Sequence, residues 1–159
     1  MAQFSCSTNA TFTPTASTTV LANGGVAMPT AGNIGKVKMF NWGGRGTSLV
    51  GYVTCWARVT TAPTGAATNG LISSSSPGIT PVATYPLVYA TTQPIRVADT
   101  QLFEQKWNVQ GGGGVVVLPI GGEWFFSGGA LSTVYSQIAC GNVVGADADL
   151  SNYGMAWEE

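Results

Sequence analysis

Apolar and polar residues alternate along several short segments of the chain, with the two-residue period of a β-strand. The clearest segment is residues 49–60, whose two faces carry Val53, Cys55, Ala57 and Val59 against Tyr52, Thr54, Trp56 and Arg58. Shorter segments of strand character are residues 4–12, 34–41, 124–126, 131–139 and 153–157. The alternation predicts strands whose two faces have different surroundings.

Residues 115–118 have a different pattern, because Val-Val-Val-Leu is a continuous apolar run. A short β-branched run of this kind is typical of a central strand that is buried on both faces. We therefore expect this segment inside a sheet.

Between the apolar segments lie glycine-rich turns, and no stretch of twelve residues has the apolar spacing of a helix. Seven or eight short strands separated by such turns predict an all-β, single-domain β-sandwich of the jelly-roll type. An immunoglobulin-like topology or a small barrel also fits this pattern.

The chain has 159 residues, which suits one domain. Residues 1–33 contain few large side chains and are expected to be an extended N-terminal arm or the first strands, with residues 34–159 as the sandwich. An arm would dock on a neighbouring subunit by strand addition, and the domain would fold without it. Residues 62–86 include four prolines and predict one long surface loop of the kind that is usually functional or bound to a partner.

Charged residues make up only 8% of the chain, and histidine is absent. General acid–base catalysis would therefore depend on carboxylates, and a serine or cysteine nucleophile would have no histidine base. A hydrolase that uses Glu104 or Glu123 is the one enzymatic alternative, and we expect that the protein is not an enzyme.

The composition also indicates which partners to exclude. The net charge is −1 and the six basic residues form no stripe, so no nucleic-acid partner is expected. No CxxC pair occurs, and residues 147–152 lack the glycine and closing glutamate of a calcium loop, so neither a metal nor a cofactor is expected. The interpretation of Cys6, Cys55 and Cys140 is three buried apolar side chains, with one disulfide and a free thiol as the alternative.

Nothing in the sequence predicts a membrane protein. No apolar run is long enough to span a bilayer, and the first residues lack the features of a signal peptide. We expect a protein that is made and folded in a cytoplasm.

Five residues are candidates for an interface or a binding site: Trp42, Arg45, Trp56, Trp107 and Trp124. Large aromatic side chains dominate both cores and subunit interfaces, and they also form platforms on which sugars stack. Trp42 adjoins a glycine-rich turn and Trp56 lies on the polar face of its strand, so these two are predicted to be the most exposed.

Three stretches carry a resemblance: Phe-Asn-Trp-Gly-Gly-Arg-Gly-Thr-Ser at 40–48, Phe-Glu-Gln-Lys-Trp-Asn at 103–108, and Tyr-Gly-Met-Ala-Trp-Glu-Glu at 153–159. With the strands rich in threonine, glycine and alanine, they resemble small β-rich virion proteins of tailed bacteriophages. The resemblance implies a capsid decoration (cement) protein, a head fibre or a tail component, commonly a trimer of jelly-roll or similar β-domains. It implies no catalytic residues.

The expected function is thus that of a non-enzymatic virion structural protein. It would oligomerise as a homotrimer on the outer particle surface and contact a major capsid protein or another virion protein. The alternative is a carbohydrate- or receptor-binding module of a phage fibre or tail tip that uses exposed Trp and Tyr side chains.

Overall fold

The computed structural model describes residues 1–7, 24–44, 51–60, 68–69, 72–83, 86–88, 95–108, 110–130, 135–144 and 151–159. All regular secondary structure in these residues is β-strand, which confirms the all-β prediction. The same residues contain no helix, and therefore none that could cross a membrane.

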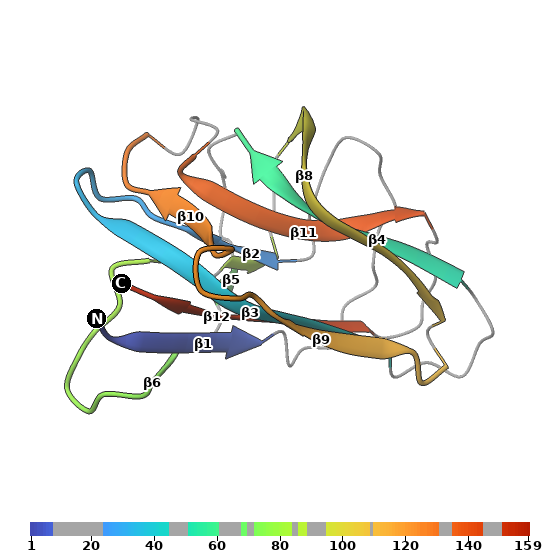
Figure 1. Ribbon diagram of the computed structural model, residues 1–159, viewed down its shortest axis with the longest axis horizontal. Helices are drawn as coiled ribbons and strands as arrows, with labels where there is room; N and C mark the ends of the chain where they lie inside the picture. Colours follow the sequence, from blue (N-terminus) through green and yellow to red (C-terminus); the bar gives the residue numbers. More distant parts are fainter. Residues whose placement is uncertain are drawn as a thin grey trace.

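Two antiparallel sheets form the molecule, as the two layers of Figure 1 show. The first sheet has the order β6-β1-β12-β3, with β9 and β10 one after the other along the remaining edge of β3. Its strands are β1 (Gln3–Ser7), β3 (Ile34–Gly44), β6 (Ser73–Ser74), β9 (Gly113–Val117), β10 (Trp124–Ser127) and β12 (Ser151–Glu158).

The second sheet has the order β2-β11-β4-β8. Its strands are β2 (Gly24–Ala27), β4 (Gly51–Val59), β8 (Arg96–Asn108) and β11 (Gln137–Val144). A separate pair consists of β5 (Thr68–Asn69) and β7 (Pro86–Val88).

The core lies between the two sheets and is rich in aromatic rings. Phe40 of the first sheet is its centre, because its ring lies 4.6 Å from Trp124, 5.0 Å from Phe103 and 5.1 Å from Trp56, centroid to centroid. Tyr153 and Trp157 of β12 are also fully buried. Two packed sheets around one apolar core confirm the predicted β-sandwich, while its jelly-roll type stays a prediction.

Strand β4 is buried on both faces, although its sequence alternates. Tyr52, Thr54 and Trp56 lie on the face that meets the first sheet, as the contacts of Trp56 with Phe40 and Tyr153 show. The other face contributes a second cluster made of Cys55, Ala57 and Val59 with Ala139 of β11. The more polar of the two faces predicted from the sequence therefore meets the main core.

Strand β9 contradicts the prediction of a strand buried on both faces. Among the described strands it pairs only with β3, so it lies at the edge of the first sheet. Its residues alternate between exposed and half-buried, and Val115 and Val117 are 63% and 71% exposed. One face of this valine-rich strand is therefore exposed to solvent.

The described part of the N-terminal segment contributes two strands to the sheets and does not form an arm. Strand β1 lies between β12 and β6, and Phe4 and Cys6 are buried in the core. Strand β2 pairs with β11, and Val26 and Met28 are also buried. The arm interpretation is wrong for these residues, because removing everything before residue 34 would remove part of the core.

The expected long loop at residues 62–86 is partly ordered into the first sheet. Strand β6 pairs with β1, and the Ser75 N–H donates to the Gln3 carbonyl at 2.9 Å. The carboxylate of Glu159 accepts hydrogen bonds from the backbone N–H groups of Val82 and Ala83, at 2.7 and 3.0 Å. These bonds fasten residues 72–83 beside the two chain ends.

Candidate interaction surface

Large exposed apolar side chains gather at the β9–β10 edge of the first sheet. Of the ten among the described residues, five lie on these two strands, on the loop between them, or at the paired end of β3: Ile34, Val115, Val117, Ile120 and Phe125. Exposed apolar side chains are ordinary when they are scattered, but a group of them marks an interaction site.

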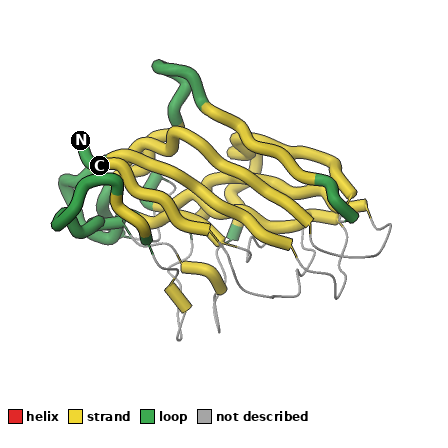
Figure 2. Tube along the Cα trace, turned by 90° about the horizontal axis from the view of Figure 1, so that it is seen from below, coloured by secondary structure: helices red, strands yellow, loops and turns green. Residues whose placement is uncertain are grey.

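The loop between β9 and β10 interrupts a single edge strand. Val117 lies opposite Met39 and Trp124 lies opposite Val37, so the residues between them face only Lys38 of β3. The Leu118 N–H still donates to the Lys38 carbonyl at 2.8 Å, and residues 119–123 then leave the sheet. Figure 2 shows this loop standing out from the sheet edge.

The loop is a tight turn that presents one apolar side chain. The Gly122 N–H donates to the Pro119 carbonyl at 2.8 Å, and Gly121 has φ +87°, a combination typical of a type II turn. Ile120, at the second position of this turn, is 95% exposed. The turn thus holds an almost fully solvated isoleucine at a fixed place.

An ion pair braces the base of this loop. Glu123 accepts a hydrogen bond from the Gly121 N–H at 2.7 Å and another from the Lys38 ammonium at 2.9 Å. Lys38 also lies 3.5 Å from a carboxylate oxygen of Glu158. The hydrogen bond from Lys38 is the main cause that lowers the pKa of Glu123 to about 2, with the backbone bonds adding to it. Glu123 is therefore ionised at neutral pH and fixes the turn.

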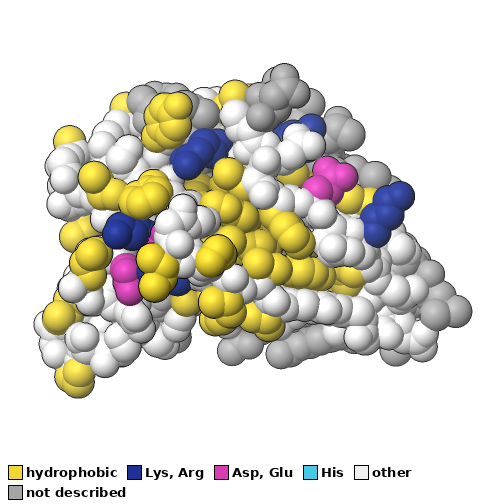
Figure 3. Space-filling model, viewed as in Figure 1, with side chains coloured by type: hydrophobic (Ala, Val, Ile, Leu, Met, Phe, Trp, Pro, Cys, Tyr) yellow, Lys and Arg dark blue, Asp and Glu magenta, His cyan; other side chains and the backbone are white. Residues whose placement is uncertain are grey.

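A second apolar feature is the strip between β8 and β9, where the two sheets face each other. Half-buried Leu102, Phe103 and Trp107 of β8 pack against the core there, as do Val116, Leu118 and Trp124 of the other sheet. Figure 3 shows hydrophobic side chains exposed in a band across this face of the molecule. The strip brings the candidates Trp107 and Trp124 to the same side of the sandwich.

Two further candidates, Trp42 and Trp56, do not join them. Trp42 is 8% exposed and Trp56 is fully buried, so the prediction that these two are the most exposed is wrong. Trp42 is covered by Phe103, 5.4 Å away between ring centroids, and Trp56 by Phe40. Arg45 lies outside the described residues.

Trp107 is tied to a buried polar network that links the sheets. Its Nε1–H donates to the Thr54 hydroxyl at 2.7 Å, and that hydroxyl donates to Asn142 Oδ1 at 2.9 Å. The Tyr153 hydroxyl of the first sheet donates to the same Oδ1 at 2.6 Å. These bonds satisfy the Thr54 hydroxyl on the inner face of β4, which would otherwise be costly to bury.

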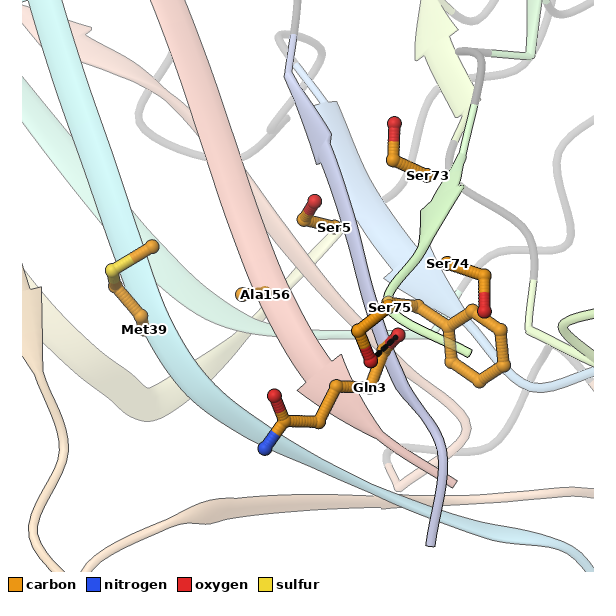
Figure 4. A pocket seen from close by; sticks show the side chains of 8 residues that line it. Gln3, Ser5, Met39, Ser73, Ser74, Ser75 and Ala156 are labelled. Atoms are coloured by element: carbon orange, nitrogen blue, oxygen red, sulfur yellow. Dashed lines mark hydrogen bonds between the residues drawn. The ribbon is translucent and has the colours of Figure 1, made fainter. Parts of the chain in front are cut away.

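A shallow hollow of about 360 Å³ lies on the outer face of the first sheet. Figure 4 shows Gln3, Ser5, Ser73 and Ser75 around it, with Met39 and Ala156 at its other side. The Ser75 hydroxyl donates to the Gln3 carbonyl at 3.1 Å. The aromatic ring in its lining belongs to Phe4, which is only 2% exposed, so the hollow has no ring on which a sugar could stack.

The two carboxylates considered for catalysis lie in different parts of the sandwich. Glu104 lies on β8, opposite Cys55 of β4, whereas Glu123 precedes β10 and bonds to Lys38. An ionised carboxylate held by a lysine is not available as a proton donor near neutral pH. Within the described part of the chain, no three metal-ligating side chains come together.

The three thiols are free and buried, as the interpretation as small apolar side chains predicts. Burial raises the pKa of Cys6 to about 11 and also raises the pKa of Cys55 and Cys140. Cys140 packs in the main core and Cys55 in the second cluster, on opposite faces of their sheet. Such thiols are unreactive core residues.

The residues that sequence reasoning missed are the exposed ones, above all Ile120. One signal was present, because Pro-Ile-Gly-Gly at 119–122 places a large apolar residue in a turn, where burial is improbable. The exposure of Val115 and Val117 had no such signal.

Comparison with protein-family models, with curated proteins and with solved structures gave no significant match.

Proposed function

We propose that the protein is a structural subunit of a virus particle, a capsid decoration protein that oligomerises on the outer surface of a capsid. The observation that carries the proposal is the group of exposed apolar side chains around the braced Ile120 turn. A turn held by Gly121, Glu123 and Lys38 loses little conformational freedom when it docks, which favours binding. The inference that this assembly is a virus particle rests on the resemblance of the sequence to virion proteins.

We also propose that the sandwich is of the jelly-roll type, an architecture found in viral capsid proteins and lectins. Its strand pairs are nested, with β1 beside β12, β2 beside β11, β3 beside β9 and β10, and β4 beside β8. This is the order of one long hairpin rolled over on itself, and the additional pairs β3–β12 and β4–β11 close the roll.

The scarcity of charge supports assembly as well. Only 13 of 159 residues are charged, six basic and seven acidic, so copies meet little repulsion and bury few ions when they pack. The outer face of the first sheet has small polar residues such as Ser5 and Ser73 toward the edge opposite its apolar one.

The alternative of a carbohydrate- or receptor-binding module stays a prediction. Burial of Trp42 and Trp56 removes two of the rings on which it rests. Quenching of tryptophan fluorescence by members of a glycan panel would test it with the remaining Trp107 and Trp124.

The proposal is tested by replacing two exposed apolar side chains of this surface, Ile120 in the turn and Val117 of β9. We expect Ile120→Asp combined with Val117→Asp to leave the fold intact, because both side chains are exposed, and to reduce the mass of the assembled protein in light scattering. The matched control is Ile79→Asp, which changes an exposed isoleucine on the loop after β6 and should leave the mass unchanged. If both variants reduce the mass equally, or if neither reduces it, a role for this surface in assembly is refuted.

A further inference from the structure

The edge of β8 that faces away from β4 has no partner among the described strands, and it is regular and long enough to accept another strand. Among the described strands β8 pairs only with β4, which makes it an edge of the second sheet. From Phe103 to Asn108 its register with β4 has no bulge, and it contains no proline. Native sheets usually protect such an edge with bulges, prolines or charges that repel a second strand.

The charges on this edge attract instead of repelling. Glu104, Gln105 and Lys106 are consecutive and exposed. When a second copy of this segment runs antiparallel to the first and both are centred on Gln105, the lysine of each copy lies opposite the glutamate of the other. Neither Glu104 nor Lys106 has an ion-pair partner within the described part of the chain.

We propose that two copies of the protein pair through their β8 edges, antiparallel, about a two-fold axis at Gln105. Glu104 of each copy then lies opposite Lys106 of the other, and Phe103 of each lies opposite Trp107 of the other. The contact is isologous, because each residue pair occurs twice. This inference rests on the proposed function, since it names a second copy as one partner in the assembly.

The faces of β8 are arranged for such a contact. Phe103 and Trp107 point toward the sandwich interior, where Phe103 lies 5.0 Å from Phe40 and Trp107 lies 5.2 Å from Tyr52 between ring centroids. Glu104 and Lys106 lie on the opposite face. Pairing would set two opposite-charge pairs on one face and two aromatic pairs on the other, both of which stabilise antiparallel strands.

The two-fold contact also predicts the stoichiometry. A closed trimer has no two-fold axis, so pairing through β8 requires dimers or assemblies built from them. Joining two second sheets would give one continuous eight-stranded sheet and cover the half-exposed parts of Phe103 and Trp107 in the strip.

The closing experiment is disulfide trapping with Gln105→Cys. Directly opposite Cα atoms of antiparallel strands lie about 4.5–5.5 Å apart, within the range that a disulfide spans. Oxidised glutathione should therefore convert the variant to a covalent dimer. The control is Gln101→Cys, exposed on the same strand but about 27 Å from its own copy in this pairing, which should stay monomeric on a non-reducing gel.

The outcomes separate this inference from the proposed function. Covalent dimers of Gln105→Cys support the two-fold contact, provided that Gln101→Cys stays monomeric. Absence of that dimer, in a protein whose light scattering still shows an oligomer, overturns the contact and leaves the proposed function standing. A wild-type chain that is monomeric at every concentration contradicts both.

Charge reversal provides a second test with its own rescue. Glu104→Lys alone should raise the dissociation constant of the dimer about tenfold, because two attractive pairs become repulsive. Lys106→Glu alone should do the same, and the two together should restore wild-type affinity. Ser73→Lys, exposed on β6 at the far edge of the other sheet, controls for net charge and should have no effect. A double variant as weak as the single ones would overturn the pairing.

Discussion

Strands β4 and β9 both differ in burial from what their sequence patterns predict, and they differ in opposite directions. Strand β4 alternates polar and apolar residues, yet Tyr52 to Ala57 are all buried. Strand β9 is Gly-Gly-Val-Val-Val, yet two of its valines are mostly exposed. The sequence alone predicts the reverse for each strand.

The difference teaches that place in the sheet decides burial here. β4 has neighbours on both edges, β11 and β8, and a core cluster on each face. β9 has one neighbour, β3, and no described strand beyond it. Thr54 on the inner face of β4 forms hydrogen bonds inside the protein, as a buried polar group requires, whereas an edge strand can leave apolar groups for a partner.

The largest expected effect comes from the interior of β4. Trp56→Ala should destabilise the protein by about 3–5 kcal/mol, because a fully buried ring leaves a cavity. Val117→Ala on β9 should cost less than about 0.5 kcal/mol, as for other exposed positions. Urea unfolding followed by circular dichroism measures both. Similar costs for the two variants would show that the burial difference is wrong.

The next effect concerns the polar network inside β4. Thr54→Val should destabilise the protein by about 1–3 kcal/mol, because the Trp107 Nε1–H loses its acceptor. Thr54→Ser keeps the hydroxyl and is the control, with a smaller loss. If the valine variant is as stable as the serine variant, the network contributes nothing to the free energy of unfolding.

A smaller, pH-dependent effect is expected at the base of the β9–β10 loop. Glu123 has a pKa lowered from its ordinary 4.5 to about 2, so its stabilising effect is present above 4.5 and is lost as pH falls toward 2. Glu123→Gln should therefore lower the melting temperature near neutral pH and converge with wild type in acid. A difference that stays constant between about pH 6 and pH 2 would contradict the ion pair with Lys38.

The smallest effect on stability, with a distinct effect on assembly, is expected at Val115. Val115→Thr keeps the β-branched shape on an exposed face, so the free energy of unfolding should change by less than about 0.5 kcal/mol. If the β9 face packs in the assembly, sedimentation velocity should show a lower oligomer fraction. An unchanged fraction would exclude Val115 from the contact.

The sequence predicts the fold class, because alternation and glycine-rich turns are local properties. It also predicts that Cys6, Cys55 and Cys140 are buried. It does not predict that β9 is an edge strand or that Trp56 faces the core, since both depend on pairing between distant segments. Ile120 could have been found from its turn. The self-complementary charges of β8 indicate pairing between copies only when the structure shows that no described strand lies beyond β8 in its sheet.

The most direct measurement of the central claim, that exposed surfaces of this chain serve its own assembly, is the mass of the purified protein by light scattering over a range of concentrations. We predict a species heavier than the 16.3 kDa chain, with dimers or multiples of dimers as concentration rises. A single species of 16.3 kDa at the highest concentration would contradict the claim.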